Sequence, residues 1–425
     1  MLFKFFTFTT IFTITLFFSA CTNQKLPINF NDKDFETLTI QSKANFASNI
    51  EKSKVDFLNK YFWVWDLKEL SYTKKEAMWG LSYKNRKIYL ENHKRASKEW
   101  FDYQISNSNF DKYNSLKLKA ITLVNTNLRI IATNSVLFYN PTKPGEGFPF
   151  DYNQNSLLKI NTPLIVSHYS KDKAWVYVQS STAGGWVNIK DIAFVDDKFI
   201  NDFKSNEFYV SIFEKFFLYD NEFREYVKIG TIFPKKYDKY LIAKKEENGF
   251  ARLYYTNIDE KYVSKFPLEY NPSNIQKIAS QLIFEPYGWG GLKGHRDCSS
   301  FTQDFFTVFG KYLSRNSSAQ KSNGIYHEIK ELSNKNKKEY IIKNGVPFST
   351  LVYLKGHIML YIGVKDNEPL VMHNIWSVKL KNWWGQEYRH IIGQTQITTL
   401  EVGKTLKNFD EEKNVLNRVE GIIIL

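Results

Sequence analysis

The sequence predicts an α+β protein of several domains, in which two small β-barrels separate an N-terminal helical region from a C-terminal mixed domain. The first observation is the length of 425 residues, which is too long for one ordinary domain. The second is a run of short strand patterns, separated by turn residues, in the middle of the chain. The third is helical spacing of apolar residues followed by alternating strands near the C-terminus, an order typical of the α+β class.

The composition is globular, with 43% hydrophobic residues, and the net charge is +14. The charges are spread along the chain, and the densest basic run, 334–338, is expected to be a solvated loop. The positive field favours anionic partners such as wall polymers or lipid head groups. Nucleic acid is not expected as a partner, because the sequence contains no recognisable nucleic-acid-binding module.

Residues 1–20 have the features of a secretory signal peptide: Lys4, an apolar stretch over 5–18, and small residues before Cys21. The ending Phe-Ser-Ala-Cys resembles a bacterial lipobox. That resemblance implies lipidation of Cys21 and an exported lipoprotein, held to a membrane and facing the periplasm or cell wall. A plain cleaved signal or an uncleaved anchor helix are the alternatives. Residues 21–34 are expected to be a polar tether.

The middle of the chain is divided by pattern into three segments. Residues 35–118 are mostly helical, most clearly over 52–63 and 74–80. Residues 119–198 contain short strands and a long aromatic loop, 144–152, and are expected to form the first barrel. Residues 199–268 repeat the strand pattern without the Gly-Trp-Val ending of the first barrel, so a second barrel that acts as a spacer is expected.

The C-terminal domain, 269–425, is expected to begin with a helix over 274–283. A second helix is expected to follow Cys298 over 299–313, because apolar residues recur there at helical spacing. Four strands are predicted after it, at 350–354, 357–364, 370–376 and 391–396.

Cys298 is the candidate nucleophile. Asp297 is suited to cap the helix that follows, and a cysteine at a helix N-terminus lies in the positive end of the helix dipole, which favours the thiolate. The alternative is a buried structural cysteine. The glycines and charged residues over 288–297 favour a surface loop instead.

Two histidines are the candidate partners of the cysteine. His357 and His373 lie on consecutive predicted strands, and a hairpin between them would bring the rings close together. His357 would accept the thiol proton and His373 would orient the imidazole. Three zinc ligands are the alternative, but no CxxC or HExxH motif supports a metal, so no cofactor is expected.

These residues, in the patterns Tyr287-x-Trp289, Arg-Asp-Cys298-Ser and Ser-Arg-Asn-Ser317, resemble the NlpC/P60 cell-wall cysteine peptidases. The resemblance is specific over 275–378. Within the family, the chain resembles the branch that carries two bacterial SH3 domains. It implies a papain-like catalytic domain behind two SH3-type barrels and a small helical region. It also implies cleavage of peptidoglycan stem peptides between γ-D-glutamate and the diamino acid, and a monomer is expected.

The resemblance also assigns substrate contacts. It places Tyr287 at the oxyanion, Trp289 as the groove wall and Asp297 at the free amine of L-Ala. Ser299 and Ser317 would hydrogen-bond the bound L-Ala-γ-D-Glu. In the aromatic loop the candidates are Glu146, Asp151 and Tyr152. The chain departs from the branch at Ser300, where many relatives have Gly, and this is expected to narrow the groove.

Two other functions are compatible with the same residues. The chain could be a non-catalytic wall-binding lipoprotein in which the barrels act, although the intact Cys298, His357 and His373 set argues against it. It could also be a transpeptidase, or an amidase acting on another acyl donor, since the same triad allows such chemistry.

Overall fold

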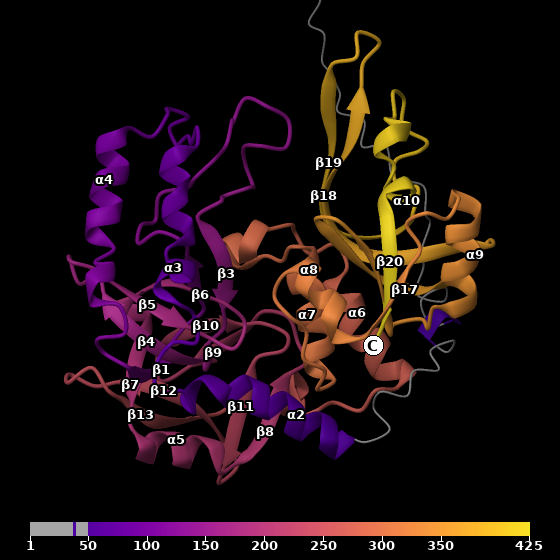
Figure 1. Cartoon of the computed structure of the whole chain (residues 1–425). Helices are drawn as coiled ribbons and strands as arrows, with labels where there is room; N and C mark the ends of the chain where they lie inside the picture. Colours follow the sequence, from indigo (N-terminus) through magenta and orange to yellow (C-terminus); the bar gives the residue numbers. More distant parts are fainter. Residues whose placement is uncertain (1–36, 40–49) are drawn as a thin grey trace, which may run out of the picture.

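A computed structural model of the chain describes residues 37–39 and 50–425 (Figure 1). An N-terminal helical region is followed by two antiparallel sheets and then by helices packed on a third sheet. This arrangement confirms the predicted α+β class. The predicted signal peptide, the tether and Cys21 lie outside the described residues. Within the two described ranges, no helix is long and apolar enough to cross a membrane.

The N-terminal region consists of short helices that pack against both β-domains. Its helices are α2 (Ile50–Phe62), α3 (Lys74–Ala77) and α4 (Lys98–Asn107), joined by 3-10 turns at Trp63–Trp65, Trp79–Asn85 and Phe110–Lys112. Trp65 is buried, and its indole donates a hydrogen bond of 2.9 Å to the carbonyl of Ala120. The predicted helix over 74–80 ends early, at Ala77, and Gly80 lies in the following 3-10 turn, where its backbone is close to Ile130.

The first β-domain is a seven-stranded sheet with the order β3-β2-β6-β5-β4-β1-β7. Its strands are β1 (Leu118–Thr122), β2 (Thr126–Arg129), β3 (Gln154–Leu158), β4 (Pro163–Tyr169), β5 (Trp175–Gln179), β6 (Gly184–Asn188) and β7 (Ile192–Val195). The long connection between β2 and β3 contains the aromatic loop and reaches the C-terminal domain.

The second β-domain follows helix α5 (Asp197–Lys204) and is a five-stranded sheet with the order β13-β12-β11-β8-β14. Its strands are β8 (Glu207–Ser211), β11 (Ile232–Lys236), β12 (Lys239–Lys245), β13 (Ala251–Thr256) and β14 (Val263–Lys265), with a separate ribbon of β9 (Phe216–Tyr219) and β10 (Phe223–Val227).

The C-terminal domain packs helices α6 (Pro272–Leu282) and α7 (Cys298–Val308) against a six-stranded sheet with the order β15-β20-β16-β17-β18-β19. The strands are β15 (Ile325–Glu328), β16 (Thr350–Leu354), β17 (His357–Lys365), β18 (Glu368–Lys381), β19 (Glu387–Thr399) and β20 (Val419–Ile424). Strands β18 and β19 are longer than predicted and extend beyond the sheet as a hairpin (Figure 1). The short helices α8 (Ser317–Gln320) and α10 (Val415–Arg418) lie in the connections.

Two local predictions for this domain are wrong. Helix α7 ends at Val308 and not near residue 313, because the backbone turns at Gly310 with φ of 75°. The expected loop over 334–338 is the start of α9 (Asn334–Asn344). Ser333 caps this helix by accepting the N–H of Asn336, and the buried Lys337 donates to the carbonyl of Asn417 at 3.0 Å.

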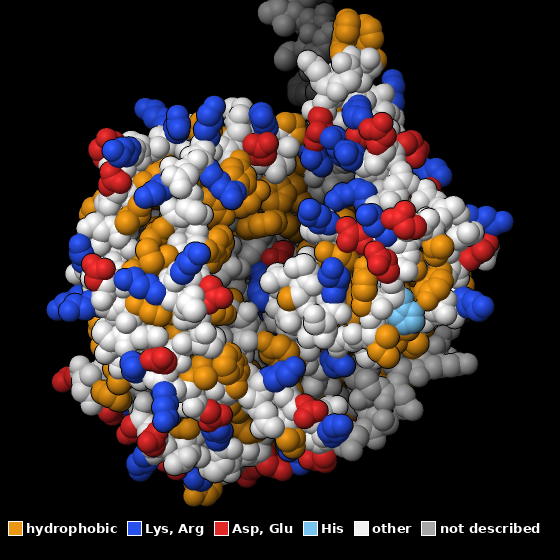
Figure 2. Space-filling view, viewed as in Figure 1, with side chains coloured by type: hydrophobic (Ala, Val, Ile, Leu, Met, Phe, Trp, Pro, Cys, Tyr) orange, Lys and Arg blue, Asp and Glu red, His pale blue; other side chains and the backbone are white. Residues whose placement is uncertain are grey.

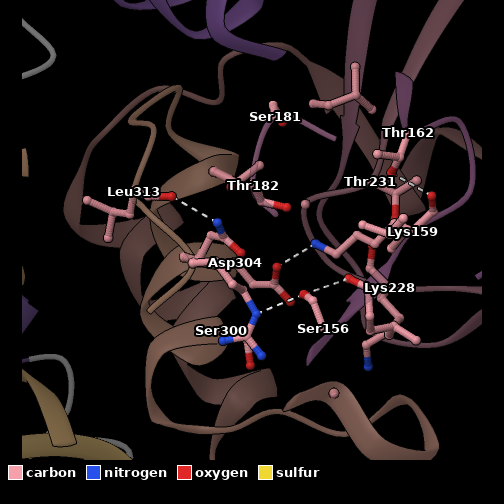
Figure 3. A pocket seen from close by; sticks show the side chains of 18 of the residues that line it. Ser156, Lys159, Thr162, Ser181, Thr182, Lys228, Thr231, Ser300, Asp304 and Leu313 are labelled. Atoms are coloured by element: carbon pink, nitrogen blue, oxygen red, sulfur yellow. Dashed lines mark hydrogen bonds and ion pairs between the residues drawn. The ribbon is translucent and has the colours of Figure 1, made fainter. Parts of the chain in front are cut away.

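A buried group of charged side chains joins the two β-domains to α7, and we call it the junction cluster. Arg296 forms two hydrogen bonds of 3.0 and 2.7 Å to Glu214 and one of 2.7 Å to Asp304. Lys228 pairs with Glu214 at 2.6 Å, and Lys159 with Asp304 at 2.5 Å. Figure 3 shows the small cavity beside this cluster, with Lys159 extended toward Asp304. Three segments far apart in sequence therefore share one set of charges.

Burial alone would raise the pKa of Glu214, but the charges of Arg296 and Lys228 hold it well below its ordinary value. Because the pKa of Glu214 is lower in the folded chain than in the unfolded chain, the ionised carboxylate stabilises the fold at pH values above about 4.5. This stabilisation is lost as the pH falls below about 4.5.

We predict that Arg296→Met lowers the free energy of unfolding by about 3–5 kcal/mol, because it leaves buried carboxylates and lysines without their central partner. Urea unfolding followed by tryptophan fluorescence measures the change. The control is Lys198→Ala, which removes an ion pair whose lysine side chain is 85% exposed and is expected to change stability by less than about 1 kcal/mol. Equal effects of the two substitutions would contradict the importance of the cluster.

Candidate active site

A groove of about 840 Å³ lies between the first β-domain and the C-terminal domain, and the surface is hollowed there (Figure 2). It contains Cys298 and His357 together with all the predicted substrate contacts in the C-terminal domain: Tyr287, Trp289, Asp297, Ser299 and Ser317. His373 lies behind His357 and is fully buried. The tertiary structure thus assembles the predicted site residues in one place.

Cys298 is the first residue of α7 and is 8% exposed. Its helix is capped by Asp297, which accepts the N–H of Ser300 at 2.8 Å. Burial and the charge of Asp297 raise the pKa of the Cys298 thiol to about 12, against the opposing effect of hydrogen bonds from the backbone N–H groups of Ile358 and Ser299. The helix start alone therefore does not produce a thiolate, which corrects the sequence-based expectation. Burial therefore favours the protonated thiol in the free site.

A hydrogen-bond chain sets the state of both histidines. The hydroxyl of Thr398 donates to the carbonyl of Thr399 at 2.8 Å. We therefore assign the Nε2–H of His373 as the donor in its 3.0 Å hydrogen bond with the Thr398 oxygen. Nδ1 of His373 is then an acceptor, and it receives the Nε2–H of His357 at 2.8 Å. The chain therefore leaves Nδ1 of His357 without a proton, as a general base requires.

Both imidazoles are neutral at neutral pH. Burial and the charge of Arg418 lower the pKa of His357 to about 4, and Asp297 opposes this shift. Burial, followed by the charge of His357, lowers the pKa of His373 well below its ordinary value. The facing nitrogens of the two rings are engaged with each other, so this geometry suits a proton relay and not a pair of ligands to one ion.

The glycine-rich segment before Cys298 is pressed against β3 and is not a free surface loop. Gly290 and Gly291 have φ of 60° and 89°, and a Cβ on either would lie within 2.5 Å of Gln154 or Leu157. The amide of Gln154 also donates to the carbonyl of Gly290 at 3.2 Å. Glycine is required here both by the positive φ and by the close approach.

Tyr287 and Trp289 flank this segment and face the groove. Burial and the proximity of Cys298 raise the pKa of the Tyr287 phenol well above its ordinary value. The phenol stays protonated and is therefore a hydrogen-bond donor beside the sulfur, as the predicted oxyanion contact needs.

Asp297 is already occupied within the protein by Arg315, a residue to which the sequence analysis assigned no role. The guanidinium of Arg315 contacts the two carboxylate oxygens of Asp297 at 2.7 and 3.1 Å, and its Nε donates to Ser156 of β3 at 2.8 Å. Ser299 also donates to Asp297, at 3.2 Å. The geometry of Asp297 is that of a helix cap in a buried ion pair, so a substrate amine would have to displace Arg315.

The aromatic loop of the first β-domain forms part of the groove wall. Phe150, which sequence analysis did not identify, lies edge-on to Trp289 at 5.3 Å and to Trp376 at 6.4 Å between ring centroids. Tyr152 contacts Trp289 at 5.7 Å. A loop predicted from a distant part of the sequence therefore reaches the candidate active site.

Two further expectations for this region are changed by the structure. Of the loop candidates, Tyr152 lines the groove, whereas Asp151 is buried in an ion pair of 2.8 Å with Arg129 and Glu146 does not line it. Ser300 does not narrow the groove, since its hydroxyl accepts the backbone N–H of Asp297 at 2.9 Å and it lines the cavity of Figure 3 instead.

Comparison with known protein families gives three matches. Residues 284–390 match the NlpC/P60 family, 137–188 match an SH3 domain of the SH3b1 type, and 10–113 match the N-terminal NLPC_P60 stabilising domain. Members of the NlpC/P60 family are generally cysteine peptidases. The search of curated proteins found no match.

A solved structure of similar overall fold agrees with these matches. A novel NlpC/P60 endopeptidase from Photobacterium damselae subsp. piscicida aligns with a TM-score of 0.83 and 25% identity, over 90% of this chain and 94% of that one. An NlpC/P60 family protein from Bacillus cereus aligns with a TM-score of 0.45 and 16% identity, over 72% of this chain and 98% of that one. The chain thus contains an NlpC/P60 family domain, preceded by an SH3 domain of the SH3b1 type and by the N-terminal stabilising domain of that family.

Proposed function

We propose that the chain is a cysteine endopeptidase that hydrolyses peptidoglycan stem peptides at the γ-D-glutamyl–diamino acid bond. The observation that carries the proposal is the hydrogen-bond chain from Thr398 through His373 to His357, which leaves an unprotonated nitrogen on a histidine that lines the same groove as Cys298. The NlpC/P60 domain match and the endopeptidase of similar structure support the same reaction class.

The reaction begins with transfer of the Cys298 proton to Nδ1 of His357. The sulfur attacks the γ-carbonyl carbon of D-glutamate, a C–S bond forms, and the carbonyl oxygen becomes an oxyanion. The Tyr287 phenol and the backbone N–H of Cys298 are the donors for that oxyanion, and such a donor typically contributes about 3 kcal/mol.

The tetrahedral intermediate then collapses. The His357 imidazolium gives its proton to the amine of the diamino acid, and the C–N bond breaks to leave a thioester on Cys298. A water molecule gives a proton to His357 and attacks the thioester, which releases the γ-D-glutamyl product and returns the proton to the sulfur. His373 accepts the Nε2–H of His357 throughout, so proton transfer takes place at Nδ1, and Thr398 orients His373 in the same way.

The setting of the enzyme is part of the same proposal and rests on the sequence pattern before residue 21. An exported chain attached to a membrane through lipidated Cys21 would act as a monomer on wall fragments close to that membrane. A free L-Ala amine on the stem would have to displace Arg315 from Asp297, the acidic residue of the groove lining.

We predict that Cys298→Ala abolishes release of the diamino acid from L-Ala-γ-D-Glu-diaminopimelate, because no other side chain replaces the nucleophile. Chromatography with mass detection measures the product, and an unchanged thermal unfolding midpoint shows that the variant is folded. Turnover by the variant at the rate of the unmodified chain would refute the assignment.

Thr398→Val removes the hydroxyl that accepts the His373 proton, so the tautomers of both rings are no longer set. We predict that kcat falls about tenfold while KM changes little, as is usual for residues that orient a catalytic group. The matched control is Thr395→Val on the same strand, since the buried Thr395 hydroxyl has no hydrogen-bond partner among the described residues. Equal losses in the two variants would argue against the relay.

Alkylation tests the resting state of the thiol. Because the pKa of Cys298 is raised and that of His357 is lowered, the thiolate fraction should be small at neutral pH and should grow as the pH rises. We predict that the rate of iodoacetamide modification climbs throughout pH 6 to 9, a range chosen to lie below the raised pKa. A rate that is already constant at pH 6 would indicate a preformed thiolate–imidazolium pair instead.

A further inference from the structure

The charged lining of the groove is basic. Apart from Asp297, its charged residues are Arg315, Lys379, Arg389, Lys413 and Arg418. Three of these are paired, Arg315 with Asp297 at 2.7 Å and both Lys379 and Arg389 with Glu387, at 2.5 and 2.6 Å. Lys413 and Arg418 form no ion pair with any residue that the structure describes. Their charges are therefore available to an anionic ligand in the groove.

Arg418 is held next to the catalytic base. It ends α10, and its Nη2 donates at 3.3 Å to the carbonyl of Lys355, in the turn immediately before His357. Its charge reaches the imidazole, since it contributes to the lowered pKa of His357. Lys413 lies on the same C-terminal segment and lines the same groove. Arg418 thus lies on the His357 side of the groove, and Lys413 adds a second unpaired positive charge to the same lining.

The chemistry of the proposed reaction identifies which part of the substrate occupies that side. A general acid must lie within hydrogen-bond reach of the amine that it protonates, so the leaving residue is next to His357. The acyl part lies toward Tyr287, whose phenol is the oxyanion donor near Cys298. In an α-amino acid the leaving amine and the α-carboxyl group are attached to the same carbon. That carboxylate therefore comes close to Arg418.

We propose that Lys413 and Arg418 form a carboxylate subsite, which selects stem peptides whose leaving residue carries a free α-carboxylate. Arg binds a carboxylate through paired N–H donors, and Lys adds a second charge. Both residues lie outside 284–390, the range that matches the NlpC/P60 family. The inference rests on the proposed endopeptidase function and narrows its substrates to stems that end at the diamino acid.

The subsite also couples binding to proton transfer. In the free site, the charge of Arg418 disfavours a protonated His357. A bound carboxylate would neutralise that charge, and the imidazole would accept the Cys298 proton more readily. A stem whose leaving residue is amide-bonded at this carboxyl group would lack both the contact and this effect.

The test compares two substrates, L-Ala-γ-D-Glu-diaminopimelate with the carboxyl group beside the scissile bond free or amidated. For the full chain we expect kcat/KM to be about tenfold or more higher for the free acid, as for a charged hydrogen-bonded contact. In the Lys413→Gln/Arg418→Gln variant this ratio should fall close to one. The control variant, Lys404→Gln/Lys407→Gln, removes the same charge from outside the groove and should keep the ratio.

Two further measurements test the carboxylate subsite independently of whether the chain hydrolyses these peptides. Arg418→Lys should retain part of the preference for the free acid, which a merely misfolded variant would not do. In the Cys298→Ala background, calorimetry measures binding of both peptides, so the subsite is tested even if the chain hydrolyses neither. The subsite is supported if the full chain prefers the acid and the Lys413→Gln/Arg418→Gln variant loses this preference. An acid-to-amide ratio near one, a ratio unchanged in that variant, or binding of neither peptide overturns it.

Discussion

The structure depends most on the ion pairs made by Arg296, the residue two positions before the candidate nucleophile. Its guanidinium is 1% exposed and contacts Glu214 of the second β-domain and Asp304 of α7. Lys159 of the first β-domain reaches the same Asp304. Isolated charges at such a site would carry a large desolvation penalty, so the three parts must come together for any of them to be satisfied. The start of α7 is positioned by this requirement.

The next residue, Asp297, is also held by a buried ion pair, on the side of α7 that faces the groove. Arg296 and Asp297 are consecutive, and each is paired with a residue from elsewhere in the chain, Glu214 and Arg315 respectively. Arg315 in turn binds Ser156 of β3. Cys298 therefore follows two residues whose side chains are each held by buried ion pairs, which fixes the start of α7 in the groove lining that also contains His357.

Cys298 and His357 are both uncharged in the free site, although the groove lining around them is basic. The thiol keeps its proton because burial and Asp297 raise its pKa, and His357 remains neutral because burial and Arg418 lower its pKa. The groove around them carries positive charge that is not fully compensated within the described part of the chain. An anionic substrate is thus the component that would complete the charge balance and allow the proton to move.

Local pattern in the sequence determined the α+β class, the helix that begins at Cys298, and the strands that carry His357 and His373. These features depend on the spacing of apolar residues and on neighbouring caps, which are written in consecutive residues. Only the tertiary structure decided that Thr398 sets the tautomers, that Arg315 occupies Asp297, and that Arg418 approaches His357. It also decided the direction of the Cys298 pKa shift, where burial and the charge of Asp297 outweigh the backbone hydrogen bonds and the charge of Arg315. The reason is physical: burial, charge pairing and proton direction depend on groups distant in sequence, and no local pattern specifies which of them will meet.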